Sequence, residues 1–330
     1  MVRKMNNPQF HCKFADIFLE FIDQKHSIGY PYKHSSLILS RFDNMVVSEF
    51  PNEDTITKAM CDTWIEKHKD LHQNTLTRDV TPVRQLAKYM NGIGKTAYVI
   101  PSYIGRKQLK YPAHIYTMQE KQAFFKSVDL CKPAMKNSPT KHYVVPVIFR
   151  LMYCCGLRES EALNLSINDV NLDDGMITIR ESKGWKVRNI FMSEDMIKQC
   201  RQYNAVISRK FPERSAFFPN KNGETLSYYT LNKWFHEFWD ILPESKNENT
   251  RNACLHSFRH TFAVDRLNAW VREGKDISAM SVYLSEYMGH LNYNATDYYL
   301  QLVSEFYPDM EEKLSSMNKN ILPEVCYEKE

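Results

Sequence analysis

Apolar residues recur at three- and four-residue steps through most of the chain, with polar residues between them. In the first hundred residues this pattern predicts four helices, at residues 12–25, 35–46, 57–69 and 74–94. The fourth begins with polar capping residues and ends near Gly92 and Gly94. The sequence therefore predicts a compact helical unit at the N-terminal side.

The rest of the chain is also mainly helical, with one exception. Helices are expected at 118–130 and 142–155, a short one after Gly156, and further ones at 255–274 and 277–290. Ser193 and Ser227 are expected to cap two more. Only the stretch "GMITIRESKGWKVRNIFMS" alternates about a glycine-containing turn, which indicates a β-hairpin. The predicted fold class is mainly α with a small antiparallel β-sheet.

A basic segment with little periodicity, at about 102–113, separates the two halves. We interpret it as a linker between domains 1–112 and 113–330. Arg106 and Lys107 could lie against phosphates, although an ordinary solvated linker fits as well. A tail helix is predicted at about 305–322, docked either on its own chain or on a neighbouring subunit.

Composition excludes several classes of protein. The chain has 330 residues, 43% hydrophobic and 25% charged, as expected for a two-domain soluble globular protein. No signal peptide is expected, and the most apolar window, 144–155, is too short to span a bilayer and contains Arg150. The eight cysteines show no C-x-x-C spacing, and no glycine-rich phosphate loop is present. We expect a cytoplasmic protein without metal or cofactor.

Charge is unevenly distributed. Residues 1–112 hold 16 Lys and Arg against 11 Asp and Glu, a net of +5, whereas the remainder has a net of −1. A basic N-terminal half is compatible with a nucleic-acid partner. The candidate DNA contacts lie in the predicted helix 74–94, where Thr75 and Thr77 could cap the helix or bind a phosphate; the basic residues there are Arg78, Arg84 and Lys88.

Residues with the chemistry to bind and attack a phosphodiester are spread along the second half. Glu161 follows Arg158 by three residues and so shares its helix face, and Lys183 lies at the hairpin tip. The remaining candidates are His256 and Arg259, one helical turn apart, then His290 and Tyr299. Each alone is as easily a surface or core residue; their joint order and spacing are far more specific.

In these residues the chain resembles a tyrosine recombinase of the phage-integrase type, related to Xer recombinases and integrases of mobile elements. The motifs that carry the resemblance are "CCGLRESEALNL", "ESKGWKVRNIFM", "LHSFRHTFAV" and "YMGHLNYNATDYYL", within about 150–302. The resemblance implies a SAM-like, core-binding helical domain that binds DNA, followed by an α+β catalytic domain.

The resemblance also implies a role for each residue. The nucleophile follows the histidine of the Gly-His pair by nine residues, which selects Tyr299; Tyr298 points about 100° away around a helix and is expected to pack or to face DNA. Arg158 and Arg259 would stabilise charge on the phosphate. His256 is the candidate general base, and His290 a further donor. Lys183 would protonate the leaving 5′ oxygen, with Lys186 and Arg188 as rivals, while Glu161 would orient an arginine or histidine.

The function implied is site-specific recombination of double-stranded DNA through a 3′-phosphotyrosyl intermediate, without metal or ATP. The expected assembly is a homotetramer on two DNA sites in the nucleoid, with accessory DNA-bending or directionality proteins as further partners. Two alternatives remain: relaxation of DNA as by a type IB topoisomerase, and a DNA-binding protein that has lost catalysis. The expected setting is a phage or other mobile element.

Overall fold

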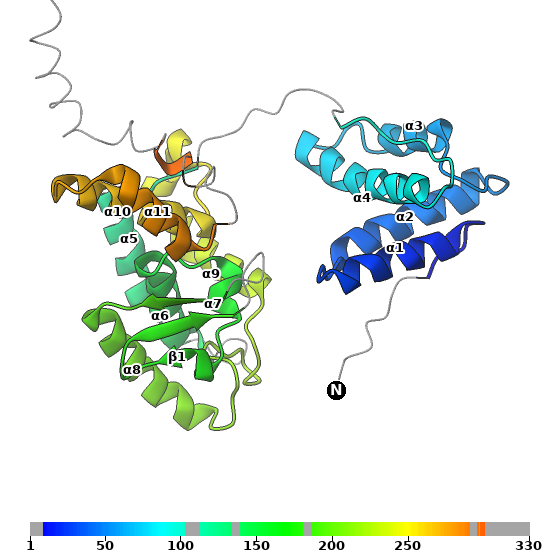
Figure 1. Cartoon of the computed structure of the whole chain (residues 1–330). Coiled ribbons are helices and arrows are strands. Elements are labelled where there is room, and N and C mark those ends of the chain that lie inside the picture. The colour runs from blue at the N-terminus through cyan, green and yellow to red at the C-terminus, as the bar shows by residue number, and fades with distance from the viewer. Residues whose placement is uncertain are drawn as a thin grey trace, which may run out of the picture. The chain divides into compact units, whose positions relative to one another are not determined.

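The computed structural model describes residues 9–102, 113–133, 139–180, 187–290, 296 and 298–300. The chain forms two compact units, Met1–Lys110 and Tyr111–Glu330 (Figure 1). Several predicted features lie outside the described residues: the tail helix at 305–322, most of the linker with Arg106 and Lys107, and the hairpin tip with Lys183 and Lys186.

The first unit is helical, as predicted. Its four helices are α1 (Ala15–Ser27), α2 (Lys33–Glu49), α3 (Lys58–Glu66) and α4 (Gln73–Gly92). Helix α4 begins earlier than expected, because the His72 side chain accepts a hydrogen bond from the Asn74 amide and so caps it. Thr75 and Thr77 lie inside the helix, and their predicted capping role is wrong.

Aromatic side chains fill the core between these helices. Phe18, Phe21 and Phe42 are almost wholly buried, and each such ring contributes about 1.5–3 kcal/mol relative to exposure. One buried carboxylate, Asp43, accepts hydrogen bonds from the amides of His11 and Cys12 at 2.9 and 3.0 Å. These bonds fix the segment that leads into α1.

The second unit places helices around a small sheet (Figure 1). In chain order its described α-helices are α5 (Met118–Asp129), α6 (Lys141–Cys154), α7 (Glu159–Leu163), α8 (Glu194–Lys210), α9 (Tyr228–Trp239), α10 (Leu255–Arg272) and α11 (Ile277–Met288). Three 3₁₀ turns lie at Ile167–Asp169, Pro243–Lys246 and Glu248–Thr250. Ser193 and Ser227 cap α8 and α9 as predicted.

The sheet has three antiparallel strands in the order β1–β2–β3, namely β1 (Val170–Asn171), β2 (Met176–Ile179) and β3 (Arg188–Phe191). The predicted hairpin is confirmed: Ile179 pairs with Arg188 and Met176 with Phe191. Ile177, Ile179 and Ile190 face the core and alternate with half-buried residues in β2 and exposed ones in β3. This register places Arg188 at the start of β3, opposite Ile179 at the end of β2.

Helix α6 runs through the middle of the second unit and contacts α5, α7, α8 and α10. Most of its apolar residues, including Val144, Ile148 and Leu151, are fully buried, as is Phe258 of α10. A helix that is apolar on nearly every side must lie inside a domain. The central position of α6 fixes the start of α7 relative to α10.

Gly156 makes the turn between α6 and α7. It has a φ of +62°, a conformation that residues with a Cβ rarely adopt, and a Cβ here would lie 2.4 Å from Cδ1 of Phe262. The Gly156 carbonyl accepts a hydrogen bond from Arg259 at 2.7 Å. The sharp turn thus brings α7 against α10.

We predict that Gly156→Ala lowers the free energy of unfolding of the second unit by about 2–4 kcal/mol, because left-handed strain adds to overpacking against Phe262. Gly274→Ala is the matched control, since Gly274 has a φ of +70° but nothing within 4 Å of its Cβ position. It should cost about 1 kcal/mol. Denaturant titration followed by tryptophan fluorescence measures both, and equal losses would contradict the packing argument.

Candidate active site

Three arginines from three different elements converge on the C-terminal end of α11. Arg158 precedes α7, Arg188 begins β3, and Arg259 belongs to α10. Their guanidinium groups donate to three consecutive carbonyls, those of Gly289 (3.0 Å), Tyr287 (2.8 Å) and Met288 (2.5 Å), respectively. We call these three side chains the arginine cluster.

The end of α11 is suited to hold cations. The last carbonyls of a helix have no partner within the helix, and the helix dipole makes this end negative. Gly289 ends the helix in the left-handed conformation, with a φ of +62°. A Cβ on Gly289 would lie 2.9 Å from Nη1 of Arg188, so glycine also leaves room for that guanidinium. These constraints explain the glycine of the Gly-His pair.

Glu161 holds the arginine cluster together. Its carboxylate, which is fully buried, accepts bonds from Arg158 Nη1 at 2.6 Å and from Arg188 Nη1 and Nη2 at 3.0 and 2.8 Å. It also accepts the Arg158 backbone amide at 2.9 Å. Burial opposes ionisation of Glu161, but the bonds from Arg188 and Arg158 outweigh it and lower the pKa to about 2.

The cluster carries excess positive charge. Arg259 is almost entirely buried, and burial followed by repulsion from Arg158 lowers its pKa to about 10, so it stays charged at neutral pH. Its Nη1 lies 3.8 Å from Glu161 Oε2. Three guanidinium charges against one carboxylate leave a net of +2. A buried excess of this size favours an anionic ligand.

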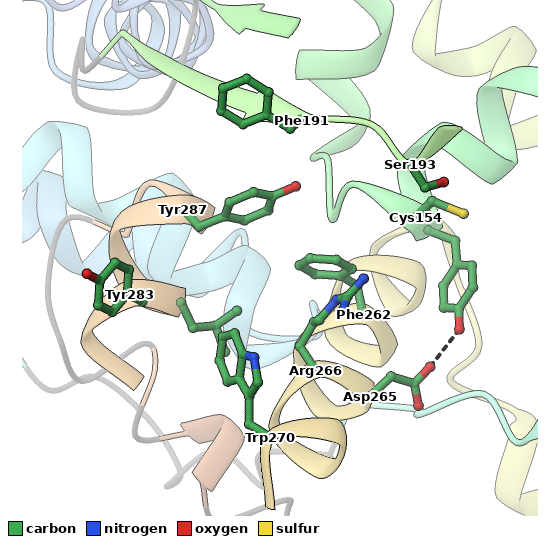
Figure 2. Close-up of a pocket in the computed structure, with 11 residues that line it drawn as sticks. Cys154, Phe191, Ser193, Phe262, Asp265, Arg266, Trp270, Tyr283 and Tyr287 are labelled. Atoms are coloured by element: carbon green, nitrogen blue, oxygen red, sulfur yellow. Dashed lines mark hydrogen bonds between the residues drawn. The ribbon is translucent and has the colours of Figure 1, made fainter. Parts of the chain in front are cut away.

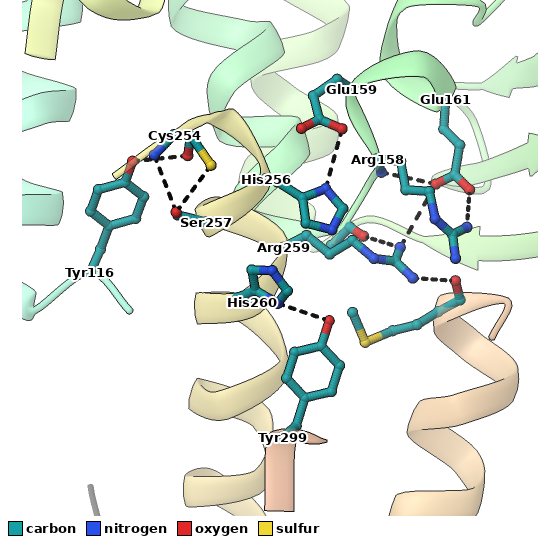
Figure 3. A network of polar contacts seen from close by, with 12 residues as sticks. Tyr116, Arg158, Glu159, Glu161, Cys254, His256, Ser257, Arg259, His260 and Tyr299 are labelled. Carbon is teal, nitrogen blue, oxygen red and sulfur yellow. Dashed lines mark hydrogen bonds and ion pairs between the residues drawn. The ribbon is translucent and has the colours of Figure 1, made fainter. Parts of the chain in front are cut away.

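The Tyr299 hydroxyl lies beside this cluster, and its side chain is buried (Figure 3). Burial raises the pKa of Tyr299 above its usual value, while Arg259 and Arg158 act in the opposite direction. The hydroxyl lies 3.1 Å from Nδ1 of His260. The phenol is therefore neutral at pH 7 in the DNA-free chain and has a histidine as its neighbour.

His256 lies one turn before His260 on α10 and makes a different contact. Its Nδ1 is 3.3 Å from Oε2 of Glu159, and its ring is partly exposed. The bond to His256 helps lower the pKa of Glu159 despite the opposing effect of burial. In the DNA-free chain His260, rather than His256, contacts the Tyr299 hydroxyl, and the role of His256 as general base stays a prediction.

His290 flanks Tyr299 on another side. The two rings stack, with centroids 5.7 Å apart and an interplanar angle of 19°. Nδ1 of His290 is 2.9 Å from the hydroxyl of Thr296, which is fully buried. Burial, with Arg259 and the other arginines, lowers the pKa of His290 to about 4. The ring is neutral at pH 7.

Tyr298 is directed elsewhere. Its hydroxyl accepts a hydrogen bond from the backbone amide of Ala113 at 2.7 Å. This contact joins the beginning of the described part of the second unit to the residue before Tyr299. Packing within the chain, one of the two expectations for Tyr298, agrees with this bond.

A family model described as the phage integrase family matches residues 128–305, which contain the whole arginine cluster and Tyr299. The chain belongs to the phage integrase family. Among curated relatives, tyrosine recombinase XerC of Lactobacillus delbrueckii subsp. bulgaricus is 24% identical over 257 residues, covering 76% of this chain and 80% of that protein. XerA of Pyrococcus furiosus is 28% identical over 175 residues, covering 53% and 56%, respectively. The resemblance to tyrosine recombinases is confirmed.

Solved structures share the fold of this phage integrase family member. The XerH site-specific recombinase bound to a palindromic difH substrate has a TM-score of 0.62 at 19% identity, covering 94% of this chain and 91% of that chain. The Tn1549 transposon integrase in complex with transposon right end DNA has a TM-score of 0.59 at 16% identity, covering 91% and 99%. The predicted fold class is confirmed.

Sequence reasoning selected most of the residues that meet here. Arg158, Glu161, His256, Arg259 and Tyr299 lie together in this family member (Figure 3), and His290 stacks on Tyr299. Lys183 is outside the described residues. Sequence reasoning missed His260. Its spacing of four residues from His256 places both histidines on one face of a helix, and this was a usable signal. Arg188 was considered only as a rival acid, yet its bidentate bond to Glu161 makes it part of the scaffold.

The predicted DNA contacts of the first unit differ in their surroundings. Arg78 and Lys88 are exposed on α4, and Arg78 bonds Asp79 at 2.8 Å. Arg84 instead donates to the carbonyls of Ile100 and Pro101 at 2.8 and 2.6 Å. Its Nε and Nη2 groups therefore bond the unit's own backbone. Thr75 is partly exposed in the first turns of α4.

A separate cavity of about 480 Å³ is lined by residues of α6, β3, α10 and α11 (Figure 2). Most of its lining is aromatic, and Tyr153 bonds Asp265 at 2.7 Å at its polar side. None of the described lining residues belongs to the arginine cluster. This mainly aromatic cavity is thus distinct from the cationic site.

Two features are absent from the described ranges. No helix there is both long and apolar enough to cross a bilayer. Nor does that part of the chain bring three His, Cys, Asp or Glu side chains together in a way that could hold a metal ion.

We predict that Glu161→Gln lowers the free energy of unfolding at pH 7 by about 3–5 kcal/mol, because it leaves buried guanidinium charge uncompensated. The folded pKa is about 2 and the unfolded value about 4.5, so this contribution is complete above pH 4.5 and declines as the pH falls toward 2. Denaturant titration at several pH values measures the difference.

The control is Glu273→Gln, in an exposed pair with Lys275, which should change stability by less than about 1 kcal/mol. A Glu161→Gln variant as stable as the wild type would show that the arginine cluster needs no carboxylate.

Proposed function

We propose that this protein is a site-specific DNA recombinase that cleaves and rejoins DNA through a 3′-phosphotyrosyl intermediate at Tyr299. The observation that carries this proposal is the buried, net-positive arginine cluster beside the Tyr299 hydroxyl. A phosphodiester is the anion that such a site and such a nucleophile can act on together. Membership of the phage integrase family supports the same reaction.

Electrostatic stabilisation would supply most of the catalysis. Attack by the phenolic oxygen builds negative charge on the two non-bridging oxygens of the phosphate. Arg158 and Arg259 present forked donors whose positions are already fixed by Glu161 and the α11 carbonyls. Because these groups are ordered before DNA arrives, little reorganisation is needed in the transition state.

The histidines at the rim would complete the phosphate site. If the Thr296 hydroxyl donates to Nδ1 of His290, the proton of that ring lies on Nε2, which can then donate to a phosphate oxygen. Glu159 holds His256 in the opposite sense: a carboxylate only accepts, so Nδ1 of His256 donates to Glu159, and Nε2 can donate to a phosphate oxygen only when the ring carries both protons. We assign His256 to phosphate binding in that doubly protonated form.

Protonation of the leaving 5′ oxygen is assigned to Lys183 by its resemblance to the family motif. Arg188, a rival for this role, is nearly buried and bonded through Nε, Nη1 and Nη2. The phosphotyrosyl bond keeps the energy of the phosphodiester, so the 5′ hydroxyl can reverse the step without ATP. Attack by a 5′ hydroxyl from a second duplex gives recombination.

The helical first unit, joined by the basic linker, is proposed to bind the duplex as the second half of a clamp. Its exposed basic residues on α4, Arg78 and Lys88, would contact phosphates, with Thr75 near the helix start. Arg106 and Lys107 would extend this contact along the linker. Assembly as a homotetramer on two sites, help from DNA-bending or directionality proteins and a place on a mobile element are parts of the same proposal.

We predict that the full-length protein forms an SDS-resistant adduct with nicked duplexes that carry its recombination site, in EDTA and without ATP. Tyr299→Phe should form no adduct while its DNA affinity stays within about threefold, because only the nucleophilic oxygen is removed. Candidate sites come from the DNA flanking its coding sequence, and gel electrophoresis after SDS treatment detects the adduct.

Tyr298→Phe is the matched control, since it removes a neighbouring hydroxyl that binds Ala113; this variant should still form the adduct. Tight DNA binding without any adduct would favour the reading as a binding protein. An adduct followed by relaxation of single supercoiled circles, with no exchange between sites, would favour the topoisomerase-like reading.

For the first unit, we predict that Lys88→Ala and Arg78→Ala each reduce the slope of log affinity against log salt concentration by about 1, because each removes one phosphate contact. Fluorescence anisotropy at several salt concentrations measures the slope. Arg84→Ala should chiefly lower thermal stability, since it loses bonds to Ile100 and Pro101. Unchanged slopes for both Lys88→Ala and Arg78→Ala would remove α4 from the DNA interface.

A further inference from the structure

The hydroxyl of Tyr299 has one histidine as its direct neighbour, and this is His260. Nδ1 of His260 and the Tyr299 oxygen are 3.1 Å apart, and their ring centroids are separated by 5.4 Å (Figure 3). His260 directly follows Arg259 on α10, so one helix presents both a guanidinium and an imidazole to the same oxygen.

The other two histidines are committed elsewhere. His256 faces Glu159 through Nδ1, and its ring meets that of His260 edge-on with centroids 4.7 Å apart. His290 stacks on the face of the Tyr299 ring and bonds Thr296. Of the three, His260 alone has a ring nitrogen in hydrogen-bond contact with the reacting oxygen.

A base is needed at this position. Because burial raises the pKa of Tyr299, almost none of it is phenolate at neutral pH in the free protein. Burial, together with nearby positive charge, lowers the pKa of His260 to about 3, so its imidazole is neutral and one ring nitrogen has an unused lone pair. The titratable and charged groups that act on or contact His260 are His256 and Arg259 on α10, Glu159 on α7, His290 after α11, and Tyr298 and Tyr299.

We propose that His260 is the general base of the cleavage step, an assignment that rests on the proposed function. With its own proton on Nε2, His260 accepts the phenolic proton at Nδ1 as the Tyr299 oxygen attacks phosphorus. The bond from phosphorus to the 5′ oxygen breaks, and that oxygen leaves as a hydroxyl with a proton from the acid assigned to Lys183. In rejoining, His260 returns its proton to the departing Tyr299 oxygen.

The charge of the site makes proton uptake by His260 dependent on bound DNA. In the free protein an imidazolium at position 260 would be repelled by Arg259 and would have to be desolvated. A phosphodiester bound at the arginine cluster adds negative charge beside His260, and the attack adds more. Both changes favour the protonated imidazole. The nucleophile is therefore kept as a neutral phenol until a phosphate enters.

The test compares His260→Asn and His260→Ala in the full-length protein on a nicked duplex that the wild type cleaves. Asparagine places a hydrogen-bonding group near the position of Nδ1 but cannot take up a proton. Alanine removes both the hydrogen-bonding group and the proton acceptor. A general base predicts that both variants lose about 10²–10⁴-fold in single-turnover adduct formation at pH 7. A residue that only positions Tyr299 predicts that His260→Asn stays within about threefold of the wild type.

The pH profile is the second readout. With the neutral base His260 in place, ionisation of Tyr299 should not make the wild-type rate depend on pH between pH 6 and 9. Without it, attack needs ionised Tyr299, so the rate of each variant should rise about tenfold per pH unit. A profile parallel to the wild type, or His260→Asn with nearly full activity, would overturn the proposal.

Two controls distinguish loss of the general base from loss of the general acid and from a nonspecific effect of replacing a histidine. A substrate with sulfur as the 5′ bridging atom needs no acid, so it should rescue Lys183→Ala but not His260→Ala. His236→Asn, an exposed histidine on α9 paired with Asp240, should keep wild-type rates. Unchanged melting temperature and DNA affinity establish that the His260 variants fold. Absence of any adduct from the wild type would refute the proposed function itself, whereas active His260 variants would refute only the base.

Discussion

The bond network around Glu161 is the constraint on which the second unit depends. One buried carboxylate and three consecutive carbonyls at the end of α11 hold three guanidinium groups that would otherwise repel one another. The four elements α7, β3, α10 and α11 are separated in sequence, and this network joins all of them. Glu161 neutralises only part of the positive charge of the three arginines. The remainder is available to a ligand, so the interactions that order the site also prepare it for an anion.

Much of this could be predicted from the sequence, because the relevant signals are local. Helical periodicity located the long helices, serines marked the starts of α8 and α9, and alternation around a turn located the hairpin. Motif order selected the residues that meet beside Tyr299. The N-terminus of α4 was misplaced because a histidine, rather than the expected threonine, supplies the cap.

What the sequence could not supply was the pairing of groups across the site. Which histidine reaches Tyr299 depends on the rotation of α10 against residues 298–300, and spacing does not determine that rotation. The rotation found in the structure places His260, not His256, at the Tyr299 hydroxyl. Arg188 likewise reads as a surface residue until the strand register turns it toward Glu161. Arg84 resembled a DNA contact because its carbonyl partners at residues 100 and 101 carry no distinctive side chains.

The bond between Tyr298 and Ala113 gives the two adjacent tyrosines complementary tasks. It joins positions that are 185 residues apart in the chain, one at the beginning of the second unit and one next to the nucleophile. The connection from Ala113 to Tyr299 thus consists of one hydrogen bond, the side chain of Tyr298 and one peptide unit.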